Sequence, residues 1–83
     1  MPTPAKAPLS DATRIFGERV LARRNQLGLS QEKAAELIGL HWTYVGQVER
    51  GQRNLTLHNI LKFATGLEID AGKLIENLSA PIE

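Results

Sequence analysis

Residues 29–51 read LSQEKAAELIGLHWTYVGQVERG and contain two short amphipathic patterns. The first pattern, residues 31–38, follows Ser30, a residue type that often caps a helix N-terminus. The second pattern, residues 41–50, is followed by Gly51, which is typical of a helix end. The segment therefore predicts two consecutive helices of two to three turns. Helices this short are marginal alone, so packing must hold them.

The turn between the two patterns has a specific geometric meaning. Gly39 permits a left-handed backbone turn without a steric penalty, and the small Ala35 allows the second helix to approach closely. Val45 and Val48, three positions apart, turn one face of the second helix inward. This layout is that of a helix-turn-helix, whose second helix is free to enter a DNA major groove. The opposite face carries Trp42, Thr43, Gly46, Gln47 and Arg50.

Three further helices are expected around this pair. One spans residues 11–27 behind the cap Ser10, one spans residues 57–66, and a short one follows Asp70 as far as Leu78. No segment alternates apolar and polar residues as a strand would. The chain is therefore predicted to be all-α, as a compact five-helix domain that contains a helix-turn-helix.

The 83 residues allow one domain at most. Residues 1–9 contain three prolines and predict a flexible N-terminal arm. We expect residues 10–78 to form the DNA-binding and dimerisation domain and residues 79–83 to form a C-terminal tail. With no long apolar run and no apolar leader, a cytoplasmic location is expected and no membrane partner.

Composition leaves little for catalysis or metal binding. The chain has no cysteine, and its two histidines lie seventeen positions apart, which is no recognisable ligand spacing. Its three serines form no cluster with a base, so no catalytic residue, cofactor, metal or small-molecule ligand is expected. Residues 1–53 carry eight Lys and Arg against five Asp and Glu, whereas residues 54–83 carry two against four. This asymmetry of charge is typical of a chain that uses one face to bind nucleic acid. A random distribution of charged residues in a chain this short would also produce it.

The chain resembles the Cro and phage-repressor type of helix-turn-helix proteins, also called the xenobiotic-response-element family, over residues 14–78. The motifs that carry the resemblance are Leu29-Ser30-Gln31, Ala35, Gly39, Val45 and Val48-Glu49-Arg50-Gly51. Within the family, Thr43-Tyr44-Val45 and Arg53-Asn54-Leu55-Thr56 resemble the controller proteins of restriction–modification systems. Ala34 and Trp42 depart from the family pattern, which often has Leu and a polar residue there. The resemblance implies a small dimeric transcriptional regulator that binds operator DNA.

Four side chains of the second helix are candidates for contact with base edges. Thr43 and Gln47 lie one turn apart on the exposed face, and Gln can pair bidentately with adenine. Tyr44 is ambiguous, because its ring could pack inward while its hydroxyl reaches a phosphate. Trp42 either touches thymine methyls or sugar or packs against the preceding helix. A second group is expected to hold phosphates, because each cation there releases condensed counterions. This group is Gln31, Arg50, Gln52, Arg53 and Asn54.

Two further sets are structural. Arg24 and Glu49 lie on faces otherwise filled by core residues, and the resemblance implies that they form a partly buried ion pair. Leu74, Ile75 and Leu78 offer more apolar surface than a short helix needs, which predicts a dimer interface made by this last helix and the end of the helix before it. The alternative function is an antitoxin or a protein-interaction module that keeps the fold. Only five residues follow Leu78, which is short for an arm that wraps a toxin.

Overall fold

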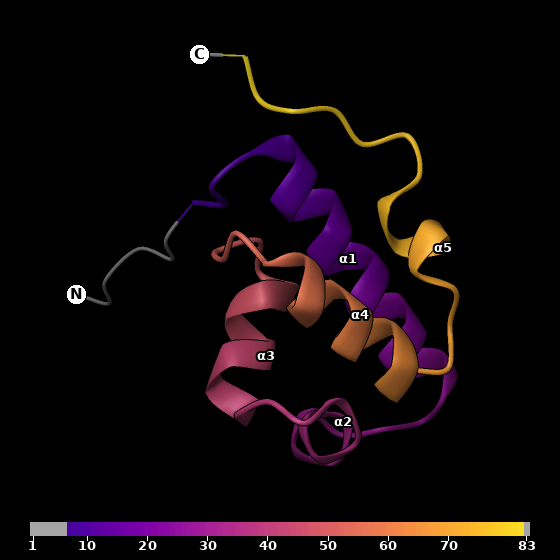
Figure 1. Cartoon of the computed structure of the whole chain (residues 1–83). Coiled ribbons are helices and arrows are strands. Elements are labelled where there is room, and N and C mark those ends of the chain that lie inside the picture. The colour runs from indigo at the N-terminus through magenta and orange to yellow at the C-terminus, as the bar shows by residue number, and fades with distance from the viewer. Residues whose placement is uncertain (1–6, 83) are drawn as a thin grey trace, which may run out of the picture.

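The computed structural model describes residues 7–82, and these form five helices joined by short loops (Figure 1). No strand is present among these residues. The all-α prediction is therefore confirmed. The helices are α1 (Asp11–Gln26), α2 (Gln31–Ile38), α3 (Trp42–Glu49), α4 (Leu57–Gly66) and α5 (Ala71–Ile75).

Polar side chains start the first four helices. The hydroxyls of Ser10, Ser30 and Thr56 each accept a hydrogen bond from a backbone N–H in the first turn of the helix that follows. His41 does the same for α3, because its Nδ1 accepts from the N–H of Thr43 at 3.1 Å. Each such bond satisfies one of the amide groups that a helix start leaves without a partner.

The fifth helix is shorter than predicted. The sequence predicts an end at Leu78, but the helix ends at Ile75, because the backbone of Glu76 is extended (ψ of 139°) and that of Asn77 is left-handed (φ of 63°). Asp70 precedes α5 without a side-chain capping bond. Arg19 of α1 holds this short helix by donating to the carbonyl oxygens of Leu74 and Glu76, at 3.1 and 2.8 Å.

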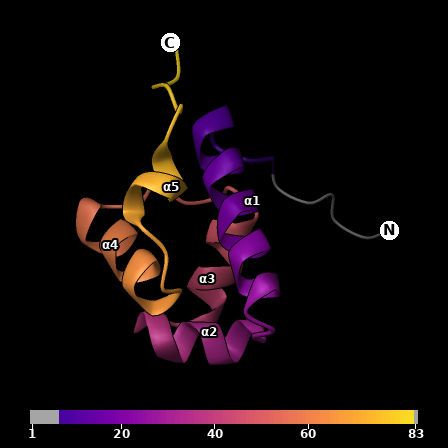
Figure 2. The same ribbon diagram turned by 90° about the vertical axis from the view of Figure 1, so that its right-hand side faces the viewer.

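The core lies between α1 on one side and α4 on the other, with α2 across one end (Figure 2). Its centre is aromatic: the rings of Phe16 and Phe63 meet edge to face with centroids 6.1 Å apart. The other fully buried large side chains are Val20, Val45, Val48, Leu67 and Leu74.

Two glycines bring the helices of the functional region together. Gly39 ends α2 in a left-handed conformation with φ of 83°, as the sequence predicted for the turn before α3. Gly17 of α1 lies directly against the last turn of α3, where a Cβ atom would sit 2.6 Å from the carbonyl oxygen of Glu49. The absence of a side chain at Gly17 therefore allows α1 and α3 to pack at backbone contact.

The start of the described chain is attached to the loop after α3. The N–H of Leu9 donates to the carbonyl oxygen of Gly51 at 2.9 Å, and the hydroxyl of Thr13 donates to the same oxygen at 2.9 Å. Leu9, at the end of the arm predicted for residues 1–9, is therefore hydrogen-bonded to the loop after α3. Residues 1–6 of that predicted arm lie outside the described residues.

Candidate nucleic-acid interface

Helix α3 is anchored by one face and exposes the other. Val45 and Val48 are buried in the core, as predicted. Thr43 is exposed, and Gln47, one turn later, is half-buried. A helix presented in this way offers polar side chains to a groove while its apolar side stays fixed.

The ion pair expected between Arg24 and Glu49 is present and joins three helices. The Nε and Nη2 atoms of Arg24 donate to the two carboxylate oxygens of Glu49 at 2.6 and 3.1 Å. Gln31, the first residue of α2, donates from its side-chain nitrogen to the same carboxylate at 2.9 Å. The cluster therefore fixes the C-terminal end of α3 relative to α1 and α2. This bond explains how Gln31 braces α3, while its phosphate contact stays a prediction.

Tyr44 packs inward rather than toward the exposed face. Its ring lies 6.5 Å from the ring of Phe63, and its hydroxyl accepts a hydrogen bond from the side-chain nitrogen of Asn59 at 3.2 Å. The ring is therefore packed inward, while contact of the half-buried Tyr44 with DNA stays a prediction. Asn59 belongs to α4, and no sequence pattern placed it near α3. Only its position in the first turn after the cap Thr56 could have drawn attention to it.

The structure joins two side chains that the sequence assigned to different roles. Arg53 lies in the loop after α3, and its Nε donates to the side-chain oxygen of Gln47 at 2.9 Å. The guanidinium of Arg53 also lies over the ring of Tyr44, 5.2 Å from its centroid. The expected base contact Gln47 and the expected phosphate contact Arg53 are therefore one unit in this structure.

The remaining candidates for DNA contact lie at the start of α3 and in the segment that follows this helix. The indole of Trp42 is half-exposed and stacks on the imidazole of His41, with centroids 5.6 Å apart, a partner that neither sequence interpretation named. The exposed Arg50 donates from Nε to the side-chain oxygen of Gln52 at 3.4 Å. Asn54 is also exposed. The loop after α3 thus presents two cations, Arg50 and Arg53, beside the exposed face of the helix.

The predicted dimer residues separate into two kinds. Leu74 is fully buried in the core of its own chain, so its assignment to an interface is wrong. Ile75 is 44% exposed and Leu78 is half-buried. Both line a small apolar hollow of about 120 Å³, with neighbours from α1, α4 and the preceding loop. These neighbours are Ala12, Thr13, Phe16, Asn54, Leu55 and Ile60.

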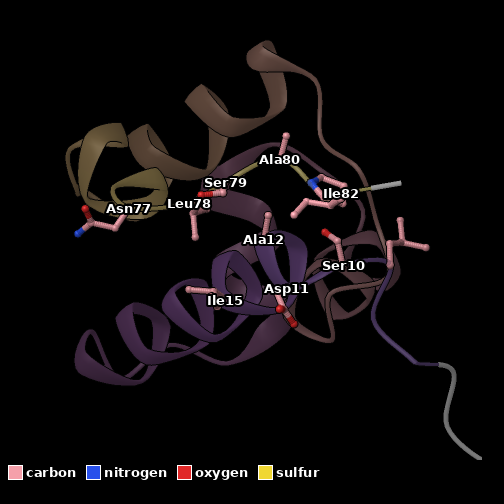
Figure 3. Close-up of a pocket in the computed structure, with 11 residues that line it drawn as sticks. Ser10, Asp11, Ala12, Ile15, Asn77, Leu78, Ser79, Ala80 and Ile82 are labelled. Atoms are coloured by element: carbon pink, nitrogen blue, oxygen red, sulfur yellow. The ribbon is translucent and has the colours of Figure 1, made fainter.

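Another hollow, of about 620 Å³, lies between the start of α1 and residues 77–82 (Figure 3). Ser10 and Ser79 both line this hollow, and the hydroxyl of Ser10 is engaged in capping α1. Asp11 is the acidic side chain that lines it. Among residues 7–82, no three His, Asp or Glu side chains are grouped to hold a metal ion. None of the described helices has the length and apolar character needed to cross a membrane.

Residues 20–74 match the HTH_3 family, described as helix-turn-helix. The control protein C.SmaI of Serratia marcescens is 45% identical over 65 residues, which are 78% of this chain and 77% of that protein. The crystal structure of the restriction-modification controller protein C.AhdI from Aeromonas hydrophila shares 53% identity and a TM-score of 0.72, covering 75% of this chain and 94% of that chain. The P22 c2 repressor protein, crystallised in complex with a synthetic operator, matches with a TM-score of 0.70 at 26% identity, covering 75% and 94% of the two chains.

Proposed function

The chain belongs to the helix-turn-helix family HTH_3, and on this premise we propose that it is a transcriptional regulator of the controller-protein type. It binds a specific double-stranded DNA operator. The observation that carries this proposal is the presentation of α3. The valines of α3 are buried, and the Arg24–Glu49 pair holds its C-terminal end. The helix therefore exposes Thr43, and the cations Arg50 and Arg53 lie beyond its C-terminal end.

The side chains divide by what they contact on DNA. Thr43 and Gln47 of α3 contact base edges in the major groove, with Trp42 at the start of the helix beside them. Tyr44 supports the helix from its inner side. Phosphate contacts come from the loop after α3 and from the start of α2, which fixes the register of the helix on the duplex. The phosphate-contacting residues are Gln31, Arg50, Gln52, Arg53 and Asn54.

The regulator acts as a dimer. One helix-turn-helix spans about 4–5 base pairs, which is too little for the affinities of about 10⁻⁸–10⁻¹¹ M typical of specific regulators. We place the two-fold interface at Ile75, Leu78 and the apolar hollow beside them. The two copies of α3 then lie roughly 34 Å apart and bind a pseudo-palindromic site. Residues 10–78 make up this DNA-binding and dimerisation unit.

Regulation follows from occupancy of the operator near a promoter, where the bound dimer changes the access of RNA polymerase. Catalysis has no part in this mechanism. The regulator acts in the cytoplasm, where the bacterial chromosome lies. Relatives that are control proteins support this regulatory role.

Selection of bound sequences from random duplex DNA, followed by sedimentation of the complex, tests the proposal. We expect enrichment of one pseudo-palindromic site and two chains per duplex. Affinity for that site should fall steeply with salt, because phosphate contacts release counterions. A protein-interaction module would instead enrich no sequence and show no salt-dependent retention on DNA.

A further inference from the structure

The Gln47 side chain of α3 is held by a chain of two hydrogen bonds and one cation–π contact that ends on another helix. Arg53 donates from Nε to the Gln47 oxygen at 2.9 Å, and its guanidinium lies over the Tyr44 ring at 5.2 Å. The Tyr44 hydroxyl in turn accepts from Asn59 of α4 at 3.2 Å. Three successive contacts therefore connect Asn59 to the amide that faces the groove.

The bond from Arg53 determines which way the Gln47 amide points. Its oxygen accepts from the guanidinium and keeps its second lone pair beside that positive charge, so the NH₂ group is the end of the amide that lies away from the cation. The positive guanidinium beside the oxygen adds further N–H donors at the same edge. The pair Gln47–Arg53 is thus a surface of donors with a net positive charge.

Bases differ in how they meet such a surface. Guanine presents two adjacent acceptors, N7 and O6, in the major groove, whereas adenine presents one acceptor and the N6 amino donor. The adenine amino group would have to approach an oxygen that already accepts from a cation, with further N–H donors beside it. Guanine places an acceptor at that point instead.

Resting on the proposed function, we propose that Arg53 is a specificity-determining residue that acts through Gln47 and selects guanine over adenine at the base that Gln47 contacts. Asn59 is a positioning residue for this pair, because it holds the Tyr44 ring on which Arg53 lies. This assignment differs from the adenine pairing of a free Gln side chain and from a simple phosphate contact for Arg53.

The experiment is selection from random duplex DNA with the full chain and five variants, each checked for folding by its thermal melt. Gln47→Ala identifies the base pair concerned, as the position at which selection is lost. At that position we expect guanine in the wild type. Arg53→Ala should lower the guanine-to-adenine ratio there by about tenfold, the scale of one good base contact. Asn59→Ala should lower the same ratio by a smaller factor.

Gln47→Glu replaces the donor that Gln47 presents to the groove with an acceptor. A carboxylate retains the bond from Arg53 but presents an acceptor to the groove, so the preferred base should change from guanine to cytosine, whose N4 amino group donates. Arg50→Ala is the matched control, an exposed arginine from the same loop region without a bond to Gln47. It should weaken binding to all sequences alike and leave the base preference unchanged.

Two results would overturn the inference and spare the proposed function. One is a wild type that selects adenine at the position identified by Gln47→Ala. The other is an Arg53→Ala variant that binds every sequence more weakly by one factor, with the same preferred base. A wild type that enriches no sequence at all would instead contradict the proposed function itself.

Discussion

Replacement of Glu49 by Ala should destabilise the protein more than any single change to its exposed ion pairs. The Glu49 side chain is 4% exposed and that of Arg24 is 15% exposed. The carboxylate accepts three hydrogen bonds, two from Arg24 and one from Gln31. Its removal leaves a nearly buried guanidinium whose remaining bond is to the carbonyl of Leu29 at 3.0 Å.

Breaking a buried pair by removing one partner costs about 3–5 kcal/mol, because the other charge remains uncompensated. Partial exposure of Arg24 lets water reach the guanidinium, so we expect about 3 kcal/mol for Glu49→Ala. In a domain of this size each kcal/mol corresponds to about 4–8 °C in Tm, which predicts a fall of roughly 12–24 °C. The double variant Arg24→Ala/Glu49→Ala should lose less than the sum of the single variants.

Chemical and thermal unfolding followed by circular dichroism measures these changes. Glu18→Ala is the control, since the Arg14–Glu18 pair has side chains 44% and 61% exposed. Removing that pair should change the free energy of unfolding by about 0–1 kcal/mol. A Glu49→Ala variant that unfolds within 1 kcal/mol of wild type would refute the reasoning about the buried cluster.

Three further predictions concern packing, capping and assembly. Gly17→Ala should lower the free energy of unfolding by about 1–3 kcal/mol, because the new Cβ meets the backbone of α3, and this outweighs the better helix propensity of Ala. An unchanged or raised Tm would count against the close packing of α1 and α3. Thr56→Ala should cost about 1 kcal/mol in urea unfolding through loss of the α4 cap, and no change would show that the cap is dispensable. Ile75→Glu should give a folded monomer in sedimentation. Leu61→Glu should remain a dimer, although Leu61 is as exposed as Ile75 (45% against 44%). Dimers in both variants would place the interface elsewhere.

Local sequence patterns were sufficient for most of the helix boundaries. Ser10, Ser30 and Thr56 are visible as caps because their side chains bond to the backbone three residues ahead, within one turn. The turn at Gly39 is equally local, since its left-handed conformation favours glycine. Such features depend on residues that are close together in the chain, so they can be predicted from the sequence.

Features that depend on tertiary packing were not predictable in this way. Leu74 and Ile75 are both apolar, and the sequence does not show that the first lies in the core while the second faces outward. The end of α5 depends on the extended backbone of Glu76 and on the left-handed conformation of Asn77, and neither residue type requires its conformation.

The candidate site shows the same division. Apolar spacing placed the buried face of α3 correctly at Val45 and Val48. The bond between Gln47 and Arg53 depends on the path of the loop after α3, and the bond between Tyr44 and Asn59 depends on how α4 packs. No periodic pattern encodes either of these contacts.

The most direct measurement of the central claim is the ratio of two dissociation constants for the wild-type protein. One is measured with the duplex obtained by selection and the other with a scrambled duplex of the same length, at the same physiological salt concentration. Specific regulators bind their sites about 10³–10⁷-fold more tightly than other DNA, and we predict a ratio in that range. A ratio near one would contradict the account, because α3 would then hold DNA without distinguishing its sequence.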